Sequence, residues 1–168
     1  KLGFDGFSAL QDSVQRDLVQ QLRPAAERIR EEAPSGRGAH VNVALANVQA
    51  TLDGAPETSI DALATRLADL SRPVRVLSGD ATAGVTLQFI SQLHQLRPEV
   101  QVLGGSEVAV RRDIAVLSPD ATVLVVDLRR YERWVLDAHA MLADRGVWTA
   151  GITDSMLSPI AARSAVTL

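Results

Sequence analysis

Apolar residues recur along this chain with two spacings, and the change from one to the other falls near residue 72. Before that point they lie three or four positions apart, as on one face of an amphipathic helix. This spacing predicts helices over residues 8–32 and 40–52 and a third helix that Ser59 can cap. Residues 34–38 contain one proline and two glycines, the composition of a linker.

The same spacing predicts which side chains these N-terminal helices bury. The expected inward positions on the second and third helices are Val41, Ala44, Leu45, Val48, Leu52, Leu63, Leu67 and Leu70. These faces, together with that of the first helix, are more than one sheet can cover, and uncovered apolar stripes usually mark interfaces. We therefore expect a homodimer.

From residue 72 onward, short β-branched runs alternate with helical segments. Strands are expected over 74–77, 100–103, 122–126, 147–152 and 165–168, with helices over 82–96, 107–116 and 132–144 and a short helix from Ser158. The run 122–126 is apolar without alternation, which is typical of a strand buried on both faces of a parallel sheet. The pattern predicts an α/β domain with a mostly parallel sheet of about five strands and right-handed crossovers.

Two predictions concern the ends and the buried faces of individual helices. Gly146 suits the left-handed residue that ends a helix. On the helix over 82–96, the inward side chains are expected to be Val85, Phe89, Ile90, Leu93 and Leu96.

Composition narrows the class of protein without naming a function. The 168 residues fit one domain with something attached, and 46% hydrophobic residues can build a sizeable core. The net charge of −3 gives no general attraction to DNA or to an anionic membrane. There is no cysteine, and no apolar run approaches the length of a membrane span, so we expect a cytoplasmic protein with no disulfide or thiolate metal site.

Ligands of open α/β sheets bind beyond the carboxyl ends of the strands, and three such ends carry polar residues. The first is the turn that contains Ser78, Gly79, Asp80 and Thr82. Backbone N–H groups and hydroxyls there suit a phosphate or carboxylate. Asp80 would repel an anion, so this turn can equally accept sugar hydroxyls or serve only to start a helix.

The second candidate follows the third strand, where Arg129, Arg130 and Tyr131 precede a helix. Arginine forks bind phosphate and carboxylate groups in bidentate fashion. The alternative is an intramolecular network of ion pairs with Asp127, Glu132 and Asp137, because charged clusters are often structural.

The remaining polar residues indicate no chemistry. The segment 153–159 could line a polar pocket, but Ser158 as a helix cap with Pro159 in the first turn is the simpler interpretation. His40, His94 and His139 have no partner at metal-ligand spacing, and His139 lies on a helical face with apolar residues. We therefore predict no catalytic residue, no metal and no cofactor.

Residues 143–161, ADRGVWTAGITDSMLSPIA, resemble a segment of the sugar isomerase (SIS) domain of RpiR-type bacterial transcription regulators, in which a helix, a glycine and a strand lead into TDS-x-x-SP-[LI]-A. Residues 2–10, LGFDGFSAL, are similar to the end of that family's helix-turn-helix domain. The resemblance implies that residues 1–35 are a remnant of the DNA-binding domain with its linker helix. It further implies that residues 36–168 are a flavodoxin-like SIS domain whose C-terminal part is incomplete.

The family resemblance implies a homodimer that senses a phosphorylated sugar or a related small anionic metabolite. Operator DNA would be bound through the missing N-terminal domain, and the fragment alone would not bind it specifically. In place of the Ser-x-Ser-Gly phosphate loop of many SIS domains, this chain has residues 127–131, DLRRY, which leaves the effector open.

Three functions are compatible with these observations. The first is a non-enzymatic effector-binding and dimerisation domain, the second an SIS-fold sugar-phosphate isomerase, and the third a dimerisation module without a ligand. An acid–base pair would favour the isomerase, and the sequence shows none. For the first function we expect the ligand in a crevice between the ends of the first and third strands, with Ser78, Gly79, Asp80 and Thr82 on one wall and Arg129, Arg130 and Tyr131 on the other.

Overall fold

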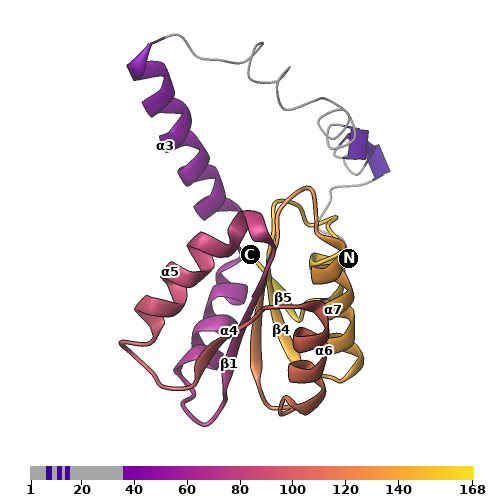
Figure 1. The fold of residues 1–168 in the computed structure, drawn as a ribbon. Coiled ribbons are helices and arrows are strands. Elements are labelled where there is room, and N and C mark those ends of the chain that lie inside the picture. The colour runs from indigo at the N-terminus through magenta and orange to yellow at the C-terminus, as the bar shows by residue number, and fades with distance from the viewer. Residues whose placement is uncertain (1–6, 9–10, 13, 16–35) are drawn as a thin grey trace. The chain divides into compact units, whose positions relative to one another are not determined.

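The computed structural model describes residues 7–8, 11–12, 14–15 and 36–168 (Figure 1). The helix expected over residues 8–32 falls mostly outside the described residues, although those that are described there are helical. The chain divides into two units, Lys1–Ala50 and Thr51–Leu168. The domain boundary expected near residue 35 stays a prediction.

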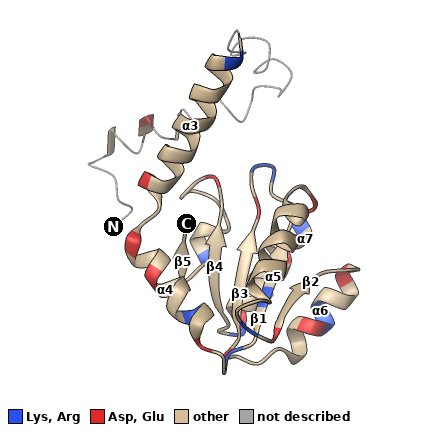
Figure 2. Cartoon of the chain, turned by 90° about the vertical axis from the view of Figure 1, so that its left-hand side faces the viewer, with Lys and Arg blue, Asp and Glu red and all other residues tan. Residues whose placement is uncertain are grey.

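Helix α3 (Arg37–Gly54) corresponds to the second expected helix but is longer at both ends. It begins within the expected linker. None of its residues is buried, so the inward face predicted for it is exposed in this chain. Figure 2 shows α3 almost without charged residues along its length.

The second unit alternates helices and strands as expected. Most boundaries agree with the sequence prediction within a few residues, because the runs of β-branched residues are short and well separated. The elements are α4 (Glu57–Ala68), β1 (Val74–Ser78), η1 (Asp80–Thr82), α5 (Ala83–Leu93), β2 (Val100–Leu103), α6 (Glu107–Val116), β3 (Thr122–Val126), α7 (Arg133–Asp144), β4 (Trp148–Ile152), η2 (Ala161–Arg163) and β5 (Val166–Thr167).

The five strands form one parallel sheet with the order β2-β1-β3-β4-β5. This is the flavodoxin-like order, in which the chain reverses its direction across the sheet between β1 and β3. Helices α4 and α5 cover one face and α6 and α7 the other (Figure 1). The predicted flavodoxin-like α/β fold with a parallel sheet of about five strands is confirmed, and its layers form a three-layer sandwich.

Two apolar clusters, one on each side of the sheet, form the core. Alternate residues of the strands point to opposite faces, so that Val76 and Leu124 join Leu63 and Ile90 on the side of α4 and α5. Leu77, with Val123 and Val125, packs on the other side against residues of α6 and α7. Strand β3 is buried on both faces, as its continuous apolar run predicts.

Several local predictions are wrong for identifiable reasons. Val85 and Leu96 are 74% and 79% exposed, because the buried face of α5 runs through Thr86, Ile90 and Leu93 and the helix ends at Leu93. Leu70 is also exposed, since α4 ends before it.

Of the residues predicted to start or end a helix, Gly146 is confirmed and Ser59 is not. Ser59 is not a cap, because α4 begins earlier, at Glu57, after Pro56. The helix expected from Ser158 is only the short η2, which begins later, at Ala161, although the Ser158 hydroxyl accepts a bond of 3.0 Å from the Ala161 N–H. Gly146 has a φ of +69°, which confirms it as the left-handed residue after α7.

His139 is a core residue, as its helical position predicts. Its ring is 1% exposed, and Nε2 lies 3.2 Å from the Thr149 hydroxyl oxygen. Burial lowers the pKa of His139 from 6.5 to about 4, and the positive charge of Arg163 acts in the same direction. The imidazole is therefore neutral in the folded domain at neutral pH.

We expect this histidine to weaken the fold as the pH falls from about 6.5 to about 4. Over that range the imidazole of the unfolded chain becomes protonated while that of the folded domain stays neutral. This difference lowers the free energy of unfolding by up to roughly 3 kcal/mol. Chemical denaturation across this range should show a smaller loss of unfolding free energy for His139→Gln than for the wild type.

The comparison has to be between variants, because the raised pKa of the Asp127 carboxyl acts in the opposite direction at acidic pH. The exposed His94 provides the control, and His94→Gln should keep the wild-type dependence. Identical curves for His139→Gln and wild type would contradict the assignment.

Candidate functional site

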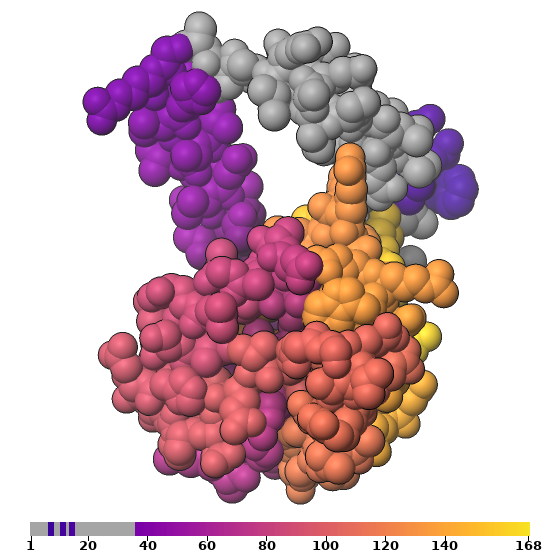
Figure 3. Space-filling view, viewed as in Figure 1, coloured from indigo at the N-terminus to yellow at the C-terminus, as the bar shows by residue number. Residues whose placement is uncertain are grey.

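The pairing of β1 with β3 brings two of the predicted loops together. The strands are in register from Val74 opposite Thr122 to Ser78 opposite Val126, so they end side by side. We call residues 78–82 the β1 loop, residues 127–132 the β3 loop and residues 153–158 the β4 loop. In Figure 3 the orange segment that contains the β3 loop stands out from the surface around it.

The β1 loop is fastened to the end of β3. The Gly79 N–H donates to the Val126 carbonyl at 3.3 Å, and the Thr82 hydroxyl donates to the same carbonyl at 3.0 Å. The Ser78 hydroxyl lies 3.0 Å from that of Thr86. The Gly79 N–H and the Thr82 hydroxyl, two of the predicted donors, are thus engaged by the chain itself.

Glu132 links the two loops, and the sequence reasoning missed this role. Its Oε1 accepts a hydrogen bond of 2.5 Å from the Asp80 N–H, and its Oε2 accepts one of 2.6 Å from the indole N–H of Trp134. The Glu132 N–H in turn donates to Asp127 Oδ2 at 2.8 Å. The sequence interpretation considered Glu132 only as an ion-pair partner of the arginines.

Gly79 is required by this arrangement because there is no space for a side chain. A Cβ atom at this position would lie 2.7 Å from Asp127 Oδ1 and 2.7 Å from Glu132 Oε1. The sequence signal was the Ser-Gly-Asp turn, but the atoms that crowd it come from a loop about fifty residues away in the chain.

The arginines of the β3 loop differ in their surroundings. Arg129 Nε lies 3.1 Å from Asp154 Oδ2, and the same carboxylate accepts a bond of 2.7 Å from the Tyr131 hydroxyl. Arg130 is exposed. Ion pairing in this cluster is therefore observed. Arg129 pairs with Asp154 of the β4 loop, which the sequence did not suggest, and Arg133 lies 4.0 Å from Asp137, which it did.

Carboxylates gather at this end of the sheet. Asp80, Asp127, Glu132 and Asp154 all lie on the three loops, and Figure 2 shows acidic segments around the arginine-bearing loop. Asp127 is 2% exposed, and its burial, together with the charge of Glu132, raises the pKa of its carboxyl. Burial also raises the pKa of Tyr131, so its hydroxyl remains a donor at neutral pH.

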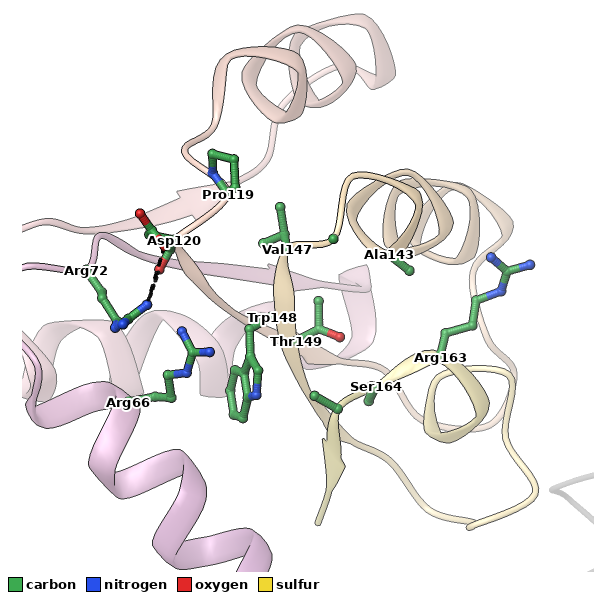
Figure 4. A pocket seen from close by; sticks show the side chains of 12 residues that line it. Arg66, Arg72, Pro119, Asp120, Ala143, Val147, Trp148, Thr149, Arg163 and Ser164 are labelled. Atoms are coloured by element: carbon green, nitrogen blue, oxygen red, sulfur yellow. Dashed lines mark hydrogen bonds and ion pairs between the residues drawn. The ribbon is translucent and has the colours of Figure 1, made fainter.

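A separate hollow lies at the opposite end of the sheet (Figure 4). It has a volume of about 520 Å³ and includes Arg66, Arg72, Trp148 and Arg163. The Arg66 guanidinium lies 4.9 Å from the centre of the Trp148 ring, Arg72 Nε is 2.7 Å from Asp69 Oδ2, and Arg163 is 3.8 Å from Asp144. The cations of this hollow are thus engaged by neighbouring side chains.

Neither a metal cluster nor a membrane helix is found in the part of the chain that the structure describes. No group of three or more His, Asp or Glu side chains there could hold a metal ion. No described helix combines the length and the apolar character that crossing a bilayer requires.

Comparison with solved structures gives neighbours of one fold. The sugar isomerase domain of an RpiR transcription factor from Sphaerobacter thermophilus matches with a TM-score of 0.60 and 29% identity, over 74% of this chain and 69% of that one. The Vibrio vulnificus NanR protein, in complex with ManNAc-6P, matches with a TM-score of 0.66 and 14% identity, over 99% of this chain and 58% of that one.

A candidate sugar-phosphate isomerase from Listeria monocytogenes matches with a TM-score of 0.53 and 14% identity, over 77% of this chain and 71% of that one. The two matches at 14% identity show the fold alone. No protein-family model matches the sequence, and no curated protein matches it either.

Fold and strand order therefore define the class: residues 51–168 have the flavodoxin-like fold found in SIS domains. Within that class the domain is similar to the sugar isomerase domain of an RpiR transcription factor, and the predicted resemblance to RpiR-type regulators is confirmed.

The tight contact at Gly79 gives a test of the loop arrangement. We expect Gly79→Ala to destabilise the domain by about 1–3 kcal/mol, because an added methyl group must push two carboxylates apart. Gly84→Ala is the matched control, since nothing lies within 4 Å of its Cβ position and alanine favours a helix. Equal unfolding free energies for the two variants, measured by urea denaturation, would contradict the loop geometry.

Proposed function

We propose that this chain is the effector-sensing and dimerisation part of a cytoplasmic, DNA-binding transcription regulator. Its effector is a small anionic, sugar-like metabolite, such as a phosphosugar or a sugar acid. The ligand binds where the β1 and β3 loops meet. The residues that contact it are Ser78, Gly79, Asp80, Thr82, Arg129, Arg130 and Tyr131.

One observation carries the position of this site. The loops that meet there follow the neighbouring strands β1 and β3, whose connecting helices lie on opposite faces of the sheet. The α/β proteins with this strand order bind ligands where two such loops diverge. The local chemistry supports a polar ligand. The Asp80 N–H already holds a carboxylate, and the β3 loop also carries the exposed Arg130 and Tyr131, whose hydroxyl donates to Asp154.

The comparisons support the kind of protein and the kind of ligand. Two structural neighbours are named as a transcription factor and as NanR, and the latter is in complex with ManNAc-6P. The chain spans 69% and 58% of their lengths, so a DNA-binding domain and operator DNA as a partner belong to the proposal. With a net charge of −3, these 168 residues are not expected to bind operator DNA specifically by themselves.

An SIS-fold isomerase is the alternative function, and a ligand-free dimerisation module is a third. We propose a non-enzymatic domain because the carboxylates of the three loops are bound to one another through backbone and arginine donors. Turnover of a sugar phosphate by the purified domain would favour the isomerase.

Homodimerisation is supported by the apolar stripe on α3. Val41, Leu45, Val48 and Leu52 follow helical spacing, and all four side chains are exposed. A stripe of this kind normally needs a partner, and a second copy presents the same surface.

The ligand prediction is tested in two steps. A thermal-shift screen of sugar phosphates, sugar acids and aldonates should find a stabilising ligand. Calorimetry with that ligand should then show Arg129→Ala or Arg130→Ala weakening binding about ten- to a hundred-fold, the effect of losing a charged hydrogen-bonding partner.

Arg133→Ala provides the control for these variants, because its side chain on α7 is 93% exposed and lies near Asp137. It should leave the affinity unchanged. Near-wild-type affinity for both Arg129→Ala and Arg130→Ala would remove the arginine wall from the site.

The dimer prediction is tested by sedimentation at micromolar protein concentration. We expect a dimer, and we expect Leu45→Glu to raise its dissociation constant about ten- to a hundred-fold, the effect of losing one buried leucine. Val43→Glu is the control, because Val43 is equally exposed but lies on the opposite side of α3. A monomeric wild type, or equal effects of both variants, would count against this interface.

A further inference from the structure

Glu132 occupies the place in the β1 loop where an anionic ligand would be held. Its carboxylate lies 2.5 Å from the Asp80 nitrogen and 2.6 Å from the Trp134 indole nitrogen. These are short bonds with a charged acceptor, the stronger kind of hydrogen bond. The N–H groups around this point are therefore used by the chain's own carboxylate.

The space around Glu132 leaves no gap for a second anion beside it. Gly79 is buried, and even a methyl group there would lie 2.7 Å from both Glu132 and Asp127. The buried Asp127 carboxyl adjoins Glu132 through the bond to its N–H group. A phosphate at this position would have to displace Glu132 and then lie against Asp127 and near Asp80.

The arginines of the β3 loop carry the opposite charge. Arg130 is exposed, and Arg129 lies between the β3 and β4 loops, paired with Asp154. Two charges of the same sign in contact at an interface cost several kcal/mol, whereas guanidinium groups attract anions. The two walls therefore favour opposite ends of a ligand.

We propose that Glu132 determines which end of the effector faces the β1 loop. It selects hydroxyl or ammonium donors at that position and keeps phosphate out, so the anionic group of the effector lies on the Arg130 side. This inference rests on the proposed function and adds to it the orientation and the class of ligand: a metabolite with a polyhydroxyl or amino end that faces Glu132.

Trp134 provides a local reporter of this position. The chain has two tryptophans, and Trp148 lies at the hollow at the other end of the sheet, so Trp148→Phe leaves Trp134 as the only indole. Because Trp134 donates to Glu132, an anion that replaces the carboxylate changes the emission of this indole.

The experiment titrates inorganic phosphate into the Trp148→Phe protein and its Glu132→Gln variant at constant ionic strength. We expect no change of Trp134 emission in the protein that keeps Glu132. The variant should bind phosphate about tenfold or more tightly, with a change of emission and a higher melting temperature, since the like charge is gone. Asp137→Asn removes the same charge five residues further along the chain, on α7, and should behave like the parent.

Three results would overturn the inference. One is phosphate that changes Trp134 emission equally with and without Glu132. Another is a gain in Asp137→Asn as large as in Glu132→Gln. The third is a folded Glu132→Gln protein that binds phosphate no more tightly than the parent. If Glu132→Gln is unstable, the titration is repeated with Glu132→Ala, and the same result there would also overturn the inference.

Failure of the proposed function can be distinguished from failure of the role proposed for Glu132. A domain that binds no sugar-class ligand in the thermal-shift screen would still give a readable phosphate titration. Equal phosphate binding with and without Glu132 would refute only the role of Glu132.

Discussion

The five-residue parallel pairing of β1 with β3 is the interaction on which the arrangement of this domain depends. Both strands lie inside the sheet, with a neighbour on each side, and their carboxyl ends, Ser78 and Val126, are side by side. Because α5 and α7 then cover opposite faces, their preceding loops meet only at this edge. Bonds from Gly79 and Thr82 to the Val126 carbonyl hold the β1 loop in place.

Charge decides what such a meeting point can bind. Backbone N–H groups alone would favour an anion, but this chain supplies its own in Glu132, with Asp127 buried next to it. The same β3 loop carries Arg129 and Arg130, and Arg129 is paired with Asp154. The same fold can therefore carry a site with different ligand preferences when a few loop residues change.

The sequence predicts the fold well because the strands are short apolar runs that turn residues separate, and the order of elements leaves few topologies open. It also predicts the β1 and β3 loops as neighbours. It cannot reveal that Glu132 reaches Asp80, since the two are far apart in the chain and a glutamate beside arginines suggests an ion pair. The prediction for the inward face of α5 is wrong at Val85, because the neighbouring Thr86 is the buried residue. The apolar side chain is exposed there and the polar one is not.

The central claim is that the ligand binds at the β1 and β3 loops rather than in the hollow at the amino ends of the strands. Backbone amide NMR of the domain, with the first stabilising ligand from the screen, tests it most directly. The account predicts that the largest shift changes fall on Gly79, Asp80, Arg130 and Glu132. Changes concentrated instead on Arg66, Trp148 and Arg163, which line the hollow, would contradict it.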